Sequence, residues 1–201
     1  MDLAYKNFDS GNKKDALAAF IKARDIRPSN AEVHYTIGYL LGCPESIEHY
    51  KKAIELNYAF DGAFLNMGIC YEKVNDVENA LIAYKEALKI DPNNSKLQYK
   101  VGYILLYAGE HKKSLIYNAK ALELQPNDYD AALNIGINHH KLKNNKLAIG
   151  AYKEAVKIKP EISRAYISLA ALYFQMGNND LGLKAIRRGN NQWGHQWGQS
   201  L

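Results

Sequence analysis

The sequence repeats itself every 34 residues. Three kinds of residue keep that spacing through the chain: Pro92, Pro126 and Pro160; Gly68, Gly102 and Gly136; and Ala87, Ala121 and Ala155. Three markers that share one period indicate an internal repeat. A period of this length predicts a small supersecondary unit that stacks on its neighbours, because one unit alone cannot bury its apolar face.

Each repeat is expected to form two helices. In the unit at 63–94, apolar residues follow the i, i+4, i+7 rhythm of a helical face in two separate blocks. Asp76, between the blocks, suits the start of a helix, and Pro92 disfavours helix at the residue before it. The recurring glycine and alanine residues would let the paired helices approach closely.

This pattern resembles the tetratricopeptide repeat (TPR) family, whose motif is W-x2-L-G-x2-Y, then A-x3-F, then Pro. The glycine position of the motif is filled by Gly38, Gly68, Gly102, Gly136 and Ala170. The second-helix aromatic position is filled by Phe20, Tyr50, Tyr84, Asn118, Tyr152 and Ile186. The resemblance implies an all-α fold, a right-handed superhelical solenoid of antiparallel helix pairs over residues 1–189. The expected repeats are 1–30, 31–60, 61–94, 95–128, 129–162 and 163–189.

Two repeats depart from the motif. The second is four residues short, about one helical turn, so Gly42 is expected to end a shortened first helix and Pro44 to lie in the first turn of the next. The first repeat begins at Met1, inside its first helix, which predicts a truncated helix there.

Residues 190–201 form a polar tail that holds both tryptophans of the chain, Trp193 and Trp197. The last helix is expected to end near Gly189, without a further cap helix. The tail either docks, in its own array or in a neighbouring copy, or has no structural role. Docking is the preferred interpretation, because disordered segments are poor in aromatic residues.

Composition indicates an ordinary globular chain of 201 residues, with 47% hydrophobic and 23% charged residues and a net charge of +5. No apolar run could span a bilayer, and the N-terminus does not resemble a signal peptide, so a cytoplasmic location is expected. Cys43 and Cys70 are too few for a disulfide framework, and Cys70 is expected to be a small buried apolar residue.

Catalytic and metal-binding motifs are absent from the sequence, including the phosphate-binding loop, H-E-x-x-H and G-x-S-x-G. His139 is expected to pack in the core, and its neighbour His140 would point about 100° away, which does not suit chelation of one metal. We therefore predict a non-catalytic protein with no cofactor and no metal site.

The resemblance to TPR proteins places one face of each first helix in a concave groove. An apolar row with a polar row beside it is typical of a surface that binds an extended peptide. The predicted peptide-binding residues are Tyr35, Tyr39, Asn66, Ile69, Lys96, Tyr99, Lys100, Tyr103, Asn134, Ile137, His140, Arg164 and Ser168. For the first member of each apolar pair, packing against the next repeat remains an alternative; these are Tyr35, Leu65, Tyr99, Leu133 and Ile167.

One TPR subfamily clamps the C-terminal carboxylate of chaperones with Lys and Asn residues. Asn66, Lys96 and Lys100 match positions of that clamp, but Tyr35 and Tyr39 occupy its first two positions. The usual carboxylate clamp is therefore disfavoured, while a ligand with apolar anchors and some acidic character fits the lysines.

The leading hypothesis is a scaffold that binds a protein or peptide segment in this groove. The alternative is a self-assembling homo-oligomer whose ends or tail contact a neighbouring copy. RNA binding is disfavoured, because the positive charge of the chain is modest. Residues 95–201 hold 15 Lys/Arg and 7 Asp/Glu, a net charge of +8, and residues 1–94 hold 11 Lys/Arg and 14 Asp/Glu, a net charge of −3.

Overall fold

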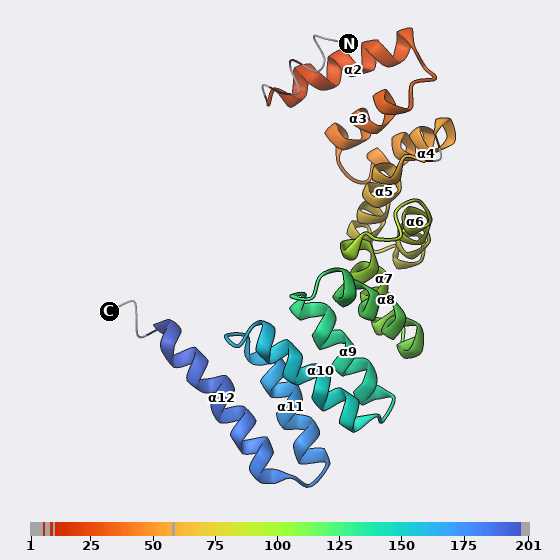
Figure 1. Ribbon diagram of the computed structural model, residues 1–201. Helices are drawn as coiled ribbons and strands as arrows, with labels where there is room; N and C mark the ends of the chain where they lie inside the picture. The colour runs from red at the N-terminus through yellow and green to blue at the C-terminus, as the bar shows by residue number, and fades with distance from the viewer. Residues whose placement is uncertain (1–5, 7–8, 10, 58, 198–201) are drawn as a thin grey trace. The chain divides into compact units, whose positions relative to one another are not determined.

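The computed structural model describes residues 6, 9, 11–57 and 59–197, with the backbone alone at 61 and 191–197. This part of the chain is all-α, as the repeat predicted (Figure 1). Its helices are α2 (Lys13–Ile26), α3 (Ala31–Leu41), α4 (Ser46–Leu56), α5 (Asp61–Lys73), α6 (Val77–Ile90), α7 (Ser95–Tyr107), α8 (His111–Leu124), α9 (Tyr129–Lys141), α10 (Asn145–Ile158), α11 (Ser163–Gln175) and α12 (Asn179–Trp197).

The chain forms two compact units, Met1–Pro92 and Asn93–Leu201. The N-terminal unit contains α2 to α6, in which α3 packs against α4 and α5 against α6. The C-terminal unit contains the pairs α7–α8, α9–α10 and α11–α12, and consecutive pairs pack on each other through α8–α9 and α10–α11. Each pair is one copy of the 34-residue repeat.

The turn inside a helix pair places one residue in the left-handed conformation at the same repeat position. These residues are Asn75, Gly109, Lys143 and Gly177, with φ of 60°, 77°, 62° and 77°. Directly after Asn75, the Asp76 carboxylate accepts a hydrogen bond from the Asn79 backbone N–H at 3.2 Å. Asp76 therefore caps α6, as the sequence predicted.

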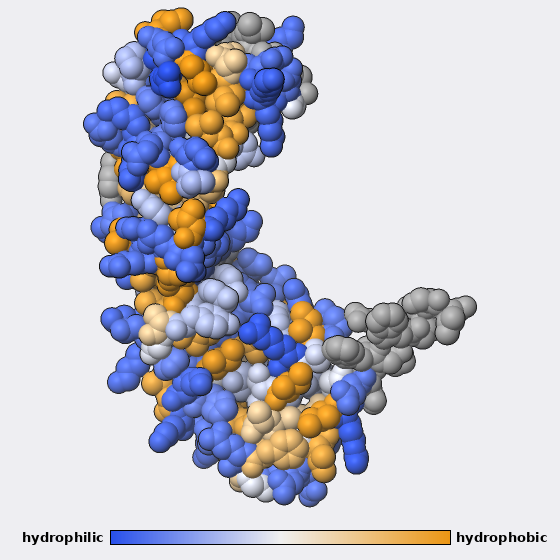
Figure 2. Space-filling view, turned by 180° about the vertical axis from the view of Figure 1, so that it is seen from behind, coloured by the Kyte–Doolittle hydropathy of each residue, from blue (hydrophilic) through white to orange (hydrophobic). Residues whose placement is uncertain are grey.

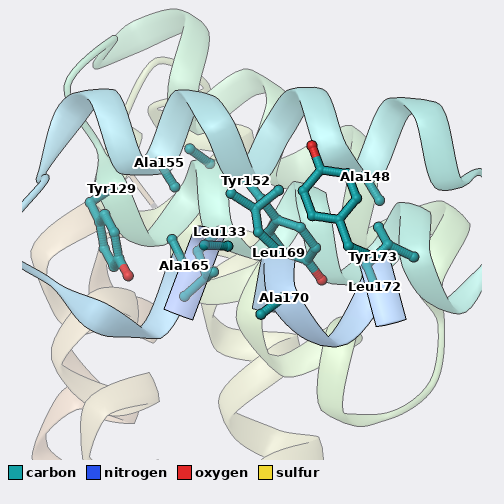
Figure 3. Packing of buried hydrophobic residues seen from close by; sticks show 12 residues of the cluster. Tyr129, Leu133, Ala148, Tyr152, Ala155, Ala165, Leu169, Ala170, Leu172 and Tyr173 are labelled. Atoms are coloured by element: carbon teal, nitrogen blue, oxygen red, sulfur yellow. The ribbon is translucent and has the colours of Figure 1, made fainter. Parts of the chain in front are cut away.

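The glycine position of the repeat accepts the aromatic ring of the second helix. In the α9–α10 pair, Tyr152 is 1% exposed, and a Cβ on Gly136 would lie 2.4 Å from its ring. Tyr152 packs with Leu169 and Tyr173 in the core of the C-terminal unit (Figure 3). Glycine is required here because any side chain would overlap a buried ring.

In the α7–α8 pair the second-helix aromatic position, held by Tyr152 in α10, is occupied by Asn118, which is fully buried. Its Nδ2 donates to the Ser114 carbonyl and hydroxyl oxygens, both at 3.0 Å. The Ser114 hydroxyl donates to the Gly102 carbonyl at 2.7 Å and accepts a hydrogen bond from Asn138 Nδ2 at 2.7 Å. A buried polar network thus joins α7, α8 and α9 where a neighbouring pair uses a tyrosine.

The short second repeat carries a disulfide between Cys43 and Cys70, whose Cα atoms are 5.2 Å apart. Helix α3 ends at Gly42, with φ of 80°, as predicted. Pro44 lies before α4, which begins at Ser46, so the placement of Pro44 in the first turn was wrong. Cys70 is buried as expected, but the sequence did not predict that it bonds to Cys43, which the short turn brings onto α5.

Helix α12 runs to Trp197, past the Gly-Asn-Asn at 189–191 where the sequence predicted its end. The side chains of Trp193 and Trp197 lie outside the described residues, so the docking prediction stays untested. No helix of the described part is long and apolar enough to cross a membrane.

Candidate functional site

The predicted binding residues of the N-terminal unit divide into a packed pair and an exposed ring. The Tyr35 ring packs on Phe60 with centroids 4.7 Å apart, and the Tyr35 hydroxyl accepts a hydrogen bond from Asn66 Nδ2 at 3.0 Å. Tyr39, one turn along α3, is 55% exposed, and Ile69 on α5 is half-buried. Tyr35 and Asn66 therefore link α3 to α5, and Tyr39 offers the larger free surface.

In the C-terminal unit, three tyrosines follow one face of α7. The ring centroids of Tyr99 and Tyr103 are 6.0 Å apart, and those of Tyr103 and Tyr107 are 4.6 Å apart. Tyr103 is 40% exposed and Tyr107 is 63% exposed. Lys96 and Lys100 lie on the same helix, Lys96 exposed and Lys100 half-buried. We call Tyr99, Tyr103 and Tyr107 the tyrosine ladder.

Burial sets the chemistry of the ladder's first ring. Desolvation, with smaller contributions from the nearby Asp130 and Asp128 carboxylates, raises the pKa of Tyr99 to about 12, against the lowering effect of Arg164. Tyr99 therefore stays a neutral hydroxyl at physiological pH. It can donate or accept a hydrogen bond, and it carries no charge that would repel an acidic ligand.

The ladder ends beside a hollow of about 400 Å³. This hollow is lined by Leu106, Tyr107, Gly109, His111, Ile137 and Lys141. It brings Ile137, a predicted binding residue on α9, next to the exposed end of α7. A side chain of leucine or phenylalanine size fits a hollow of this kind, with Lys141 at its edge.

Asn134 differs from its expected position. It is 5% exposed, and its Nδ2 donates to Asn118 Oδ1 at 3.3 Å, inside the buried polar network. The expectation that its amide faces a peptide in the groove does not agree with this burial. The sequence suggested a solvent-facing amide because Asn134 holds the same repeat position as Asn66.

Three further predicted residues lie on α9 and α11. His140 Nε2 is 2.7 Å from Gln175 Oε1, which ties α9 to α11. The Ser168 hydroxyl donates to the Arg164 carbonyl of its own helix at 3.0 Å. Arg164 is exposed and supplies the positive charge of this face.

Family models for the tetratricopeptide repeat match residues 63–94 and residues 99–163. The chain belongs to the tetratricopeptide repeat family. Its repeats support a protein-interaction scaffold.

Solved TPR structures share this fold. YrrB, described as a TPR protein with an unusual peptide-binding site, superposes with a TM-score of 0.78 and 22% identity over 87% of this chain and 92% of that one. A MamA structure superposes with a TM-score of 0.72 and 22% identity, over 76% of this chain and 90% of that one. MamA from Desulfovibrio magneticus RS-1 superposes with a TM-score of 0.75 and 19% identity, over 83% of this chain and 96% of that one. At these identities the likeness shows the fold alone.

A curated relative is the UDP-N-acetylglucosamine–peptide N-acetylglucosaminyltransferase of Giardia intestinalis. It is 28% identical over 87 residues, which is 41% of this TPR protein. The chain spans 6% of the enzyme's length. A match of that extent is no evidence of transferase activity here.

The first members of the apolar pairs do not behave alike in this TPR protein. Leu133 is 1% exposed and Tyr35 packs on its neighbours, so the packing alternative holds for these two. Ile167 in the last repeat is 61% exposed. Leu65 and Tyr99 are half-buried.

His139, at the first-helix position of the fifth repeat, lies partly inside the fold. His139 is half-buried, and desolvation lowers its pKa, so it is neutral at physiological pH. Across the described residues, no group of three or more His, Cys, Asp or Glu side chains is placed to hold a metal ion.

Two features of this TPR protein were missed from sequence: the Cys43–Cys70 disulfide, and a basic pocket between α10, α11 and α12. The pocket had a signal, since Lys153, Lys157, Lys184 and Arg188 form two i, i+4 pairs on successive second helices. The disulfide had no such signal in the sequence, because its two cysteines lie in different helix pairs.

Proposed function

We propose that this TPR protein is a non-catalytic scaffold that binds an extended protein segment across the first helices of its repeats. The observation that carries the proposal is the tyrosine ladder with Lys96 and Lys100 beside it and the hollow at Ile137 beyond it. Exposed aromatic rings supply large contact area at low entropic cost, and the lysines favour acidic residues next to the apolar anchors.

The double variant Tyr103→Ala with Lys100→Glu tests this proposal. We expect binding of a peptide selected on the wild-type protein from a random display library to weaken by about tenfold or more, because a central ring and a charge are lost. Fluorescence polarisation with the labelled peptide measures the change.

The matched control is Ile116→Ala with Lys112→Glu on α8, which removes the same kinds of side chain from an exposed site in the same unit. Its affinity should stay within about twofold of wild type. Equal affinity of the ladder variant and the wild type would contradict the proposal.

Self-assembly is the second candidate function, favoured by the apolar side chains that the last repeat leaves exposed. Ile167 is 61%, Leu181 45%, Leu183 47% and Ile186 38% exposed. A further helix, or a neighbouring copy, would cover such surface in a continuing array. The homo-oligomer remains the alternative to an outside partner.

Deletion of residues 190–201 tests tail-driven assembly. If the tail bridges copies, sedimentation velocity at several concentrations should show a larger species for the intact chain and the monomer for the truncated one. An unchanged size distribution argues against a role of the tail.

The cytoplasmic location predicted from the N-terminus stays a prediction, and the Cys43–Cys70 pair offers a way to test it. Disulfides persist in oxidising compartments, whereas cytosolic thiol systems keep cysteines reduced. A Cys43–Cys70 bond that persists in the cell would indicate an oxidising compartment, and two free thiols would indicate the cytoplasm. Thiol labelling of the protein in unbroken host cells would distinguish the two locations.

A further inference from the structure

A pocket of about 390 Å³ lies between α10, α11 and α12, away from the tyrosine ladder. The lining residues Tyr166, Leu169 and Tyr173 lie on one face of α11. Arg164, Ile167 and Ser168, which belong to the face of the proposed groove, lie on the opposite face of the same helix. The pocket is therefore a separate site on the other side of this helix.

The floor of the pocket is apolar. Leu169 is 5% exposed, Ala185 7% and Tyr166 7%, and Val156 and Leu181 complete the lining. Leu169 and Tyr173 lie side by side in the core below it (Figure 3). The floor thus continues the hydrophobic core to the surface and offers contact area to an apolar side chain.

The rim of the pocket is basic. Lys153 and Lys157 lie one turn apart on α10, and Lys184 and Arg188 lie one turn apart on α12, about 6 Å along each helix axis. No aspartate or glutamate is among the lining residues. Within the described residues, only Lys157 of these four forms an ion pair, with Glu154 at 3.4 Å.

Packing of the repeats does not require these charges. In the preceding repeat, 34 residues earlier, the four equivalent positions are Ala119, Glu123, Gly150 and Glu154. The equivalent junction one repeat earlier thus has two neutral and two acidic residues where the last junction has four basic ones. The basic rim is a property of the last junction and not of the fold.

The lining of the pocket combines apolar and basic side chains. Figure 2, coloured by hydropathy, shows orange apolar patches among blue hydrophilic side chains on one face of the molecule. The sequence after residue 190 contains no aspartate or glutamate. The rim therefore presents positive charge beside the apolar floor, which is complementary to an acidic ligand.

We propose that this pocket is a second binding site, specific for an acidic peptide segment that carries a leucine or phenylalanine anchor. The anchor enters the apolar floor, and acidic residues on both sides of it pair with Lys153 and Lys157 on α10 and with Lys184 and Arg188 on α12. A peptide suits the site because two helices each contribute a basic pair spaced by one helical turn, and a peptide can carry several acidic groups to match them.

The probe for this site is a fluorescein-labelled peptide, Asp-Glu-Asp-Leu-Phe-Asp-Glu-Asp, measured by fluorescence polarisation with the full chain. The variant Lys184→Glu with Arg188→Glu should bind it about tenfold more weakly or worse, because attraction becomes repulsion. Leu181→Ala, at a partly exposed floor position, should also weaken binding. The control Lys112→Glu with Lys146→Glu makes the same charge change elsewhere in the unit and should retain binding within about twofold.

Three results would overturn the inference. Equal loss in the control variant would mean attraction by net charge alone. Equal binding of a peptide with alanines in place of Leu-Phe would mean that the apolar floor is not used. Binding that is lost in the Tyr103→Ala, Lys100→Glu variant but kept in the pocket variant would place the peptide on the ladder, which would support the proposed function while removing this second site.

Discussion

Reduction of the Cys43–Cys70 disulfide is expected to lower the free energy of unfolding of the N-terminal unit by about 3 kcal/mol. The bond joins the α3–α4 turn to α5 across a sequence separation of 27 residues. Closing a loop of that size removes conformational freedom from the unfolded chain, which is worth about 3 to 4 kcal/mol in the entropic model. Opening the bond restores that freedom, while the helices keep their packing contacts.

Hydrogen–deuterium exchange followed by mass spectrometry measures this effect separately in each unit. After reduction, the most protected amides of α3, α4 and α5 should exchange roughly 100-fold faster, which corresponds to about 3 kcal/mol. The amides of α9 and α10 provide an internal control, because the disulfide lies wholly in the N-terminal unit.

The double variant Cys43→Ala, Cys70→Ala provides a second control, since a reductant should not change its exchange rates. Unchanged exchange of α3 to α5 in the reduced wild-type protein would contradict the prediction. Two free thiols in the native, unreduced protein would contradict the disulfide itself.

The disulfide also shows where the sequence was insufficient. The 34-residue period predicted each helix pair and the glycine–aromatic contact, because these features repeat and one copy supports the next. The four-residue deletion in the second repeat occurs once. Its consequence, Cys43 lying within bonding distance of Cys70, depends on the path of a single turn and is not encoded in any period.

The binding face was predicted in outline and not residue by residue. Asn66 and Asn134 hold the same repeat position, yet Asn66 donates to a tyrosine hydroxyl and Asn134 to a buried asparagine. The difference arises one helix away, at the second-helix aromatic position. Tyr50 fills this position in the second repeat, whereas Asn118 fills it in the fourth and turns the amide of Asn134 inward.

Replacement of Ser114 by alanine is expected to destabilise the C-terminal unit by about 3 kcal/mol. Its hydroxyl donates to the Gly102 carbonyl and accepts from Asn118 and Asn138, and all three partners are buried. Asn118 keeps its bond to the Ser114 carbonyl, but Asn138 Nδ2 loses the partner at 2.7 Å. A buried polar group left unpaired costs about 1 to 3 kcal/mol, and the lost bond to Gly102 adds to it.

Exchange rates again provide the measurement, with α7, α8 and α9 as the reporting helices. Ser168→Ala is the matched control, because its half-buried hydroxyl donates to the Arg164 carbonyl of its own helix and does not belong to the Ser114 network. That variant should change the free energy of unfolding by about 0.5 kcal/mol or less. Equal effects of the two substitutions would show that the buried network contributes no more than a single intrahelical bond.

The network also connects stability to binding. It holds α7, which carries the tyrosine ladder, against α8 and α9, which carry Ser114, Asn134 and Asn138. Loosening it should therefore weaken peptide binding at the ladder without any change to a residue that contacts the peptide. The acidic probe at the α10–α12 pocket should keep its affinity in the same variant, because none of the residues that line this pocket belongs to the network.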